Sequence, residues 1–254
     1  MIDVHAHFDD ERFDEDRAEI ISAMAEMPIR FILNSGSHIE ACRRTLALAD
    51  QYDFIYAAIG IYPHDTAILE EQGLGPIREM LKHKKVRAVG EIGLDYYYDM
   101  IPKATQQKWF HAQLEMAEEY HLPVVIHSRD AMQDTLSILK EHPKNTGIFH
   151  CYSGSAESLK EVLKLGFSIS MGGVVTFKNA RVAKEVAAAV PLDRLMLETD
   201  SPYLAPTPYR GKRNSSLYLP EIAKEIAAIR GMTPEEIERI TDENAIRMFG
   251  FGEK

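Results

Sequence analysis

The sequence has little cysteine, no long apolar run and no basic excess, and each shortage excludes a class of protein. Its 254 residues include two cysteines, Cys42 and Cys151, which are too few for a disulfide framework and are typical of a reducing compartment. The apolar run at 54–62 is far shorter than the ~20 residues of a membrane span. The acidic beginning, MIDVHAHFDDERFDED, lacks the basic flank and apolar stretch of a signal peptide. We therefore expect a cytoplasmic protein with no membrane partner.

The charge balance is acidic, with 29 Lys and Arg against 39 Asp and Glu, a formal net charge of -10. This argues against charge-driven coating of nucleic acid. It does not exclude nucleic acid as a substrate, because bound cations and a local basic patch can carry that contact. The length and the 45% hydrophobic content suit an ordinary globular protein with a sizeable core.

Short apolar segments alternate with longer amphipathic ones along the whole chain, without a linker or an internal repeat. Strands are predicted at 2–5, 29–33, 54–59, 86–89, 123–126, 147–149, 167–170 and 194–197. Helices are predicted at 39–51, 105–120, 131–141, 156–164, 180–189, 219–230 and 234–249. The strands are mostly continuous apolar runs, which is typical of parallel strands buried on both faces.

Eight strand–helix units in ~250 residues favour an α/β protein with a (β/α)8 TIM barrel. An open doubly wound sheet is the alternative, but it would usually carry a glycine-rich loop after its first strand. The chain reads HAHFDDERF there, with no glycine. We expect a single barrel domain over 1–254, with C-terminal helices at about 219–249.

Potential metal ligands follow five of the predicted strands. The C-terminal ends of all barrel strands meet on one face, where active sites lie. Six side chains should therefore converge: His5, His7, Glu91, His127, His150 and Asp200.

The types and spacing of these residues predict a site for two metal ions. His5 and His7 are two apart, so on a strand both point the same way. The two oxygens of Glu91 suit a bridging ligand, and neighbouring strands supply His127 and His150 for a second ion. Asp200 suits both a ligand and a proton acceptor. Mixed nitrogen and oxygen ligands favour Zn, Mn, Fe or Co over Mg or Ca. Each residue alone has an ordinary explanation, as a helix cap or a core histidine, but the six together favour a metal site.

The same residues lie in motifs that resemble the TatD-related metal-dependent deoxyribonucleases of the amidohydrolase-like superfamily. The motifs cover nearly the whole chain: DVHAHFDD at 3–10, GIYPHD at 60–65, GEIGLDYYY at 90–98, PVVIHSRDA at 123–131, FHCYSGS at 149–155, LETDSPYLAP at 197–206 and GKRN at 211–214. The resemblance implies that one divalent cation is held by His5, His7, Glu91 and Asp200, and a second by Glu91, His127 and His150. It also implies a nuclease that uses Mg or other divalent metals, in some relatives a 3′–5′ exonuclease on single strands.

Two positions depart from the family pattern. Tyr62 stands where the family often has a second histidine, which puts in doubt any role shared with His64. The chain continues GKRN with Ser215 and Ser216, where the family often has Glu-Pro, so substrate contacts in that loop are in doubt.

Several residues near the predicted site are candidates for binding substrate. His64 and Arg129 are expected to contact phosphate, although His64 could pack in its own loop and Arg129 could pair with Asp130 or Asp134. Asp95 could orient a ligand or cap the next segment. Tyr96, Tyr97, Tyr98 and Tyr203 could stack on bases, with at least one in the core. The basic segment with Arg210, Lys212 and Arg213 could steer phosphate or be a solvated loop.

The expected activity is hydrolysis of phosphodiester bonds in DNA with two divalent cations, Mg, Mn or Zn, and with Asp200 and Glu91 as catalytic residues. We expect a monomer. Two alternatives stay open. One is hydrolysis of esters or amides, including D-aminoacyl-tRNA. The other is a binding protein that keeps a relic site, although the presence of all six ligands argues against it.

Overall fold

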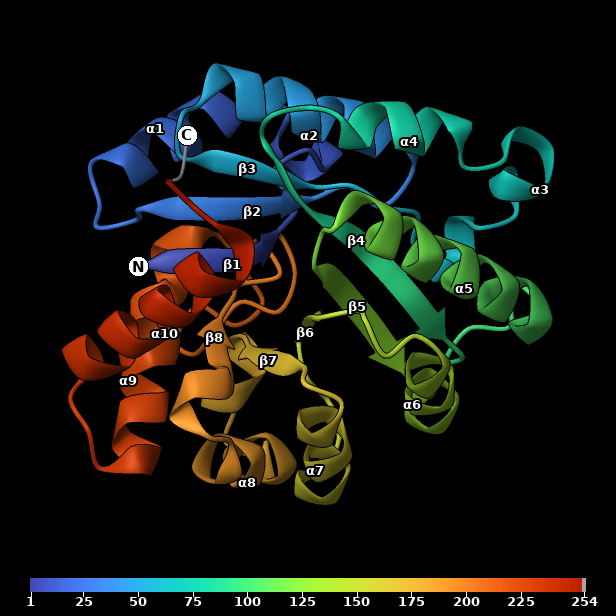
Figure 1. The fold of residues 1–254 in the computed structure, drawn as a ribbon. Helices are drawn as coiled ribbons and strands as arrows, with labels where there is room; N and C mark the ends of the chain where they lie inside the picture. The colour runs from blue at the N-terminus through green and yellow to red at the C-terminus, as the bar shows by residue number, and fades with distance from the viewer. Residues whose placement is uncertain (253–254) are drawn as a thin grey trace.

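Eight parallel strands lie side by side in chain order in the computed structural model, which describes residues 1–252 (Figure 1). They are β1 (Ile2–Ala6), β2 (Phe31–Ser35), β3 (Ile55–Ala58), β4 (Val86–Asp95), β5 (Val124–Arg129), β6 (Gly147–Phe149), β7 (Ser168–Met171) and β8 (Leu195–Leu197). A parallel bridge between Ala6 and Ser201 joins the first strand to the segment after the last. The predicted TIM barrel is confirmed, and the open sheet is wrong.

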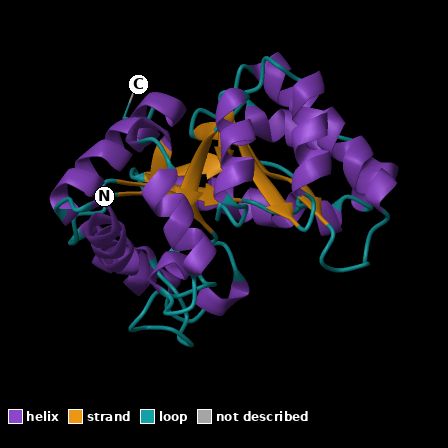
Figure 2. Cartoon of the chain, turned by 90° about the horizontal axis from the view of Figure 1, so that it is seen from below, coloured by secondary structure: helices purple, strands orange, loops and turns teal. Residues whose placement is uncertain are grey.

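Helices surround the strands, as the view from below shows (Figure 2). They are α1 (Arg17–Ala25), α2 (Ile39–Gln51), α3 (Ile68–Gln72), α4 (Gly75–Leu81), α5 (Lys103–Tyr120), α6 (Met132–Glu141), α7 (Ala156–Lys164), α8 (Arg181–Ala189), α9 (Leu219–Arg230) and α10 (Pro234–Phe249). The sequence pattern did not predict α1, α3 and α4. α3 and α4 are short, and α1 buries only Ile21 and Met24, so none has a clear apolar periodicity.

The last helix shows how local sequence sets its bounds. Thr233 accepts a hydrogen bond from the backbone N–H of Glu236, whose carboxylate accepts one from the N–H of Thr233. Gly250 ends the helix in the left-handed conformation, at φ +62°. Ala245 and Phe249 of α10 pack against apolar side chains that the strands direct into the barrel, including Val4 and Leu33. It therefore closes one end of the barrel and leaves the opposite end for a site.

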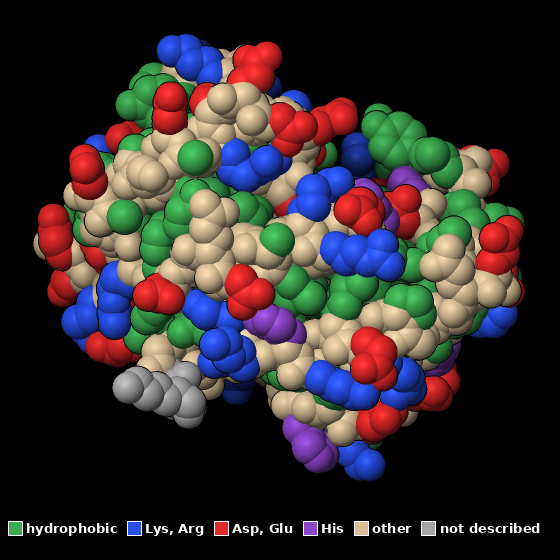
Figure 3. Space-filling model, turned by 90° about the horizontal axis from the view of Figure 1, so that it is seen from above, with side chains coloured by type: hydrophobic (Ala, Val, Ile, Leu, Met, Phe, Trp, Pro, Cys, Tyr) green, Lys and Arg blue, Asp and Glu red, His purple; other side chains and the backbone are tan. Residues whose placement is uncertain are grey.

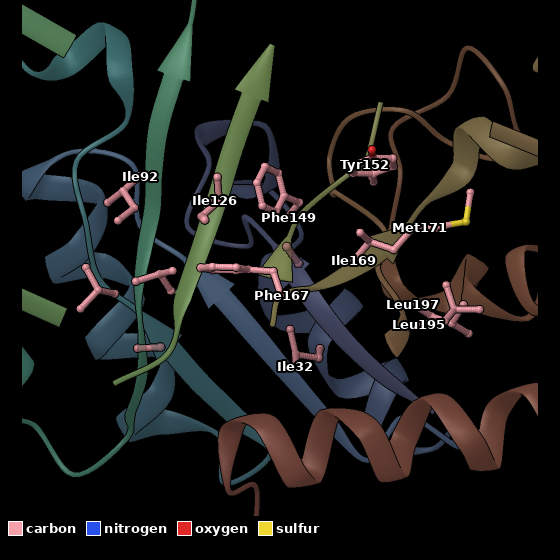
Figure 4. Close-up of a cluster of buried hydrophobic side chains, with 14 of the residues drawn as sticks. Ile32, Ile92, Ile126, Phe149, Tyr152, Phe167, Ile169, Met171, Leu195 and Leu197 are labelled. Atoms are coloured by element: carbon pink, nitrogen blue, oxygen red, sulfur yellow. The ribbon is translucent and has the colours of Figure 1, made fainter. Parts of the chain in front are cut away.

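A second apolar layer lies between the barrel and its helices. It includes Ile126, Phe149, Ile169 and Leu197 from the strands, which Figure 4 shows with neighbouring side chains. Residues of α5, α7 and α9 belong to the same buried cluster. The strands are thus buried on both faces, which explains their continuous apolar pattern.

β4 and β5 extend beyond their predicted ends. β4 was expected to end at Val89, but it stays paired with β5 as far as the Asp95–Arg129 pair. Gly93 permits this close approach, because a Cβ atom there would lie 2.0 Å from the carbonyl oxygen of His127. Glu91 and His127 consequently lie within strands and are held more rigidly than loop residues would be.

The surface seen from above Figure 1 carries acidic and basic side chains side by side (Figure 3). Within residues 1–252, none of the helices has the length and apolar character needed to cross a bilayer.

Candidate metal centre

Residues from the two ends of the chain form the first group of candidate ligands. The Nε2 atoms of His5 and His7 lie 3.0 Å apart. Oδ1 of Asp200 lies 3.6 Å from the first and 3.5 Å from the second. Asp200 has a positive φ of 56°, and its N–H donates to the carbonyl oxygen of His5 at 3.0 Å. This turn brings its carboxylate against the two imidazoles, and the three donor atoms lie close enough to hold one ion.

Glu91 links this group to a second one. Its Oε1 lies 2.8 Å from Nδ1 of His127 and 2.8 Å from Nε2 of His150. Its Oε2 lies 3.5 Å from His5 and 3.6 Å from His7. The carboxylate therefore lies between the two histidine pairs, where a ligand shared by two ions would be. The structure brings together all six predicted ligands.

The hydrogen bonds of the imidazoles leave their facing nitrogens free to bind a cation. Nδ1 of His7 lies 2.7 Å from the carbonyl oxygen of Ser35, so it carries the proton and Nε2 presents a lone pair. Nε2 of His127 lies 3.1 Å from Oδ2 of Asp95, so Nδ1 presents the lone pair, 3.1 Å from Nε2 of His150. Such nitrogens repel each other unless a proton or a metal ion lies between them. The donor set therefore fits divalent cations.

Burial and mutual charge set the protonation of the metal-free site. Burial opposes protonation of His7, but the carboxylates of Asp200 and Glu91 outweigh it and raise the pKa of His7 to about 9. Burial likewise opposes ionisation of Glu91, yet the surrounding histidines hold its pKa well below the usual range. For His5, burial and the charge of His150 lower the pKa. A cation that enters the site would take the place of protons.

Two buried carboxylates, Asp95 and Glu198, lie on the outer sides of the imidazoles. Asp95 contacts His127 and also accepts a hydrogen bond from the Tyr62 hydroxyl at 2.6 Å. Burial opposes its charge, but the bonds from His127 and Tyr62 lower the pKa of Asp95 to about 2. Oε1 of Glu198 lies 3.6 Å from Nδ1 of His150, and neither of these buried atoms has a hydrogen-bond partner within residues 1–252. A hydrogen-bonded partner such as Asp95 fixes the ring orientation and the tautomer of a metal-binding histidine.

Sequence reasoning missed the contacts of Tyr62 and the whole role of Glu198. Glu198 is fully buried and accepts a short hydrogen bond from Ser170. Its position directly after the last strand, where active sites of barrels lie, was the available signal.

Five of the six residues line a cleft of about 1240 Å³, and His5 is fully buried beside them. Arg129 lines it, and among residues 1–252 no carboxylate pairs with its guanidinium, which lies 3.7 Å from the centre of the Tyr97 ring. The alternative partner Asp134 instead accepts hydrogen bonds from Tyr96 and Gln107. His64 packs beside the end of β4, with its Nε2 3.3 Å from the carbonyl oxygen of Asp95.

The structure does not place the predicted basic patch in this cleft. Arg213 pairs with Asp16 at 2.5 Å and lies over the Phe13 ring. Arg210 lies over Phe177, and Lys212 is 6.0 Å from the centre of the Tyr209 ring. Arg213 thus anchors the loop after β8 against the loop after β1, and Arg210 anchors it against Phe177 in the loop after β7, so the loop serves at least a structural purpose.

Known proteins share this fold and length. A family model described as TatD related DNase matches residues 2–250. The chain is 45% identical to the uncharacterized metal-dependent hydrolase YabD of Bacillus subtilis (strain 168), with 98% of both chains covered. It is 33% identical to the 3′-5′ ssDNA/RNA exonuclease TatD of Rahnella sp. (strain Y9602), again over 98% of both. The crystal structure of YJJV, a TatD homologue from Escherichia coli K12, superposes with a TM-score of 0.91 and 31% identity over 98% of both chains.

Proposed function

The chain belongs to the TatD-related DNase family of metal-dependent hydrolases, and within that family we propose that it removes nucleotides from an end of single-stranded nucleic acid, DNA first of all, in the 3′–5′ direction. The observation that supports the proposal is the convergence of four imidazoles and two carboxylates, five of which line an open cleft. The nuclease named among the relatives supports the choice of bond and substrate.

Each residue of the centre has a role in this proposal. His5, His7, Glu91 and Asp200 would hold one divalent cation, and Glu91, His127 and His150 the second. Divalent cations held there supply Lewis acidity, which polarises a phosphodiester and acidifies water. The carboxylate of Asp200 takes up the proton of the attacking water. In the metal-free site burial opposes the charge of Asp200, but the hydrogen bond from His7 holds its pKa below the usual range. Arg129, without a carboxylate partner, binds a phosphate of the substrate.

The test uses protein stripped of metal with a chelator and then given Mg, Mn or Zn. Single-stranded DNA labelled at one end is the substrate, and a His127→Ala/His150→Ala variant is the negative control. His83→Ala is the matched control, because this half-buried histidine pairs with Asp50 away from the cleft. We expect a metal-dependent ladder from one end with the parent and with His83→Ala, and none with the double variant.

A second variant separates chemistry from binding. Asp200→Asn should remove turnover while sparing much of the DNA binding, and unchanged turnover would exclude its role as proton acceptor. Intact DNA with every metal, from protein that binds two ions, would contradict the nuclease proposal. Release of free amino acid from a D-aminoacyl-tRNA, with the RNA left intact, would then identify an ester hydrolase.

A further inference from the structure

The exposed apolar side chains of the protein gather around the cleft. Residues 1–252 expose seven large hydrophobic side chains, and four of these line the cleft: Tyr98, Val182, Tyr203 and Leu204. Tyr97 and Met100 are two of the others, and they lie beside Tyr98 in the chain. Because folded proteins seldom expose contiguous apolar surface without a use, this clustering indicates a ligand with apolar faces.

Two tyrosines lie beside the candidate metal centre, one near each of its two groups of candidate ligands. The Tyr203 ring lies 6.2 Å from the ring of His7, which belongs to the first group of ligands. The Tyr98 ring lies 5.8 Å from His64, in the region of Tyr62, whose ring is 4.9 Å from that of His127 in the second group. Tyr98 and Tyr203 are 50% and 42% exposed, so both rings have surface available for a ligand.

An arginine lies near each tyrosine, but only one of the two arginines is paired with a carboxylate. Arg12 lies over Tyr203 at 4.1 Å and pairs with Asp10 at 3.0 Å. Arg129 lies 5.4 Å from the Tyr98 ring centre and has no such carboxylate in the described chain. The net positive charge on the Tyr98 side suits phosphate. On the Tyr203 side Arg12 is neutralised by Asp10 and covers part of the ring, and the exposed remainder of the ring offers an aromatic surface without net charge.

We propose that Tyr98 and Tyr203 are stacking surfaces for two unpaired nucleobases on either side of the cleaved phosphodiester, with Arg129 binding the phosphate next to the base on Tyr98. This inference rests on the proposed function and specifies its substrate as single-stranded nucleic acid of at least two nucleotides. A base within a duplex has both faces covered by its neighbours and cannot stack on either ring without leaving the helix.

The experiment measures binding and cleavage separately. Fluorescence anisotropy with a labelled single-stranded DNA and Mn is carried out in the Asp200→Asn background, and cleavage is measured with Asp200 intact. We expect Tyr98→Ala and Tyr203→Ala each to weaken binding by about tenfold, while Tyr98→Phe and Tyr203→Phe retain it, because stacking needs the ring and not the hydroxyl. Met27→Ala, an exposed apolar residue that does not line the cleft, is the control and should have no effect.

Oligonucleotides with abasic positions distinguish stacking from a structural role. On DNA that lacks the two bases next to the cleaved bond, the two alanine variants should bind as well as the parent. Arg129→Gln should lower the slope of log affinity against log salt by about 0.7, as expected for one phosphate contact with a single strand. Blunt duplex DNA should bind more weakly than the single strand.

The outcomes separate this inference from the proposed function. Cleavage by the parent with unchanged binding in both alanine variants would overturn the stacking inference and leave the nuclease intact. Equal losses on normal and abasic DNA would also overturn it, since they would indicate altered structure. Binding that depends on both tyrosines, in protein that cleaves no polynucleotide, would support the stacking surfaces and contradict the hydrolytic proposal.

Discussion

Asp95 should control the affinity of one of the two proposed metal ions, although it is not among the candidate ligands. Its carboxylate lies 3.1 Å from Nε2 of His127, and the proton on that nitrogen is what leaves Nδ1 free to face Glu91 and His150. Asp95→Asn removes the negative charge and offers an amide that can donate as well as accept. An amide that donates to Nε2 would force the proton onto Nδ1, the atom that the metal needs.

The size of the effect follows from the position of Asp95. Loss of a buried partner of a metal-binding histidine typically weakens metal binding 10–100-fold, or about 1.4–2.7 kcal/mol. We expect this loss for the ion at Glu91, His127 and His150, and little change for the ion at His5, His7 and Asp200. Tyr62→Phe should have a smaller effect, because it removes one hydrogen bond to Asp95 and keeps the charge.

The measurement is a competition titration of Zn against a chromophoric chelator, which resolves the two ions by affinity and needs no turnover. Asp134→Asn is the matched control, since Asp134 contacts Tyr96 and Gln107 and no imidazole. If Asp95→Asn binds both ions within about twofold of the parent, the orienting role of Asp95 is refuted, whatever happens to activity.

Three further predictions concern the folded chain itself. Burial raises the pKa of the Cys42 thiol to about 12, so it should stay protonated at pH 9. In a Cys151→Ser background, iodoacetamide should label Cys42 only after unfolding, and rapid labelling of the folded protein would contradict this. Gly93→Ala places a Cβ at 2.0 Å from the His127 carbonyl at φ +144°, so it should lower the free energy of unfolding by more than about 1 kcal/mol in a denaturant titration. Gly75→Ala is the control, because its Cβ would meet no atom within 4 Å. Phe249→Ala leaves a cavity in the apolar cluster between α10 and the strands, and it should lower the free energy of unfolding by about 3–5 kcal/mol. A loss below about 1 kcal/mol would show that α10 does not seal that end.

The sequence predicted the architecture because most strands are largely apolar runs and the longer helices, apart from α1, could be recognised from their amphipathic pattern. α2, α7, α9 and α10 begin and end at the predicted residues. The strand ends were predicted less well, since β4 and β5 continue through Glu91 and His127 into polar sequence. Hydrophobic pattern does not reveal pairing that depends on a neighbouring backbone, such as the contact that Gly93 allows.

The convergence of the six candidate ligands could be predicted because barrel topology brings all the strand ends to one face. Its outer partners could not, since the bond from Tyr62 to Asp95 joins residues 33 apart in the chain. The sequence shows the cluster of basic residues in the loop after β8. It does not show that Asp16, far away in the chain, pairs with Arg213.

The acidic balance of the chain makes metal and substrate binding depend on each other. The cleft is lined by Asp9, Asp10, Glu11 and Asp14 on the β1 side, and the arginines in its lining are Arg44 and Arg129. Metal-free protein should therefore repel a polyanion there, and two divalent cations would reverse the local potential. Stacking carries no net charge, so the tyrosines can contribute affinity without a basic surface. A nuclease built in this way should show a shallow dependence of binding on salt, because it makes few phosphate contacts through its own side chains.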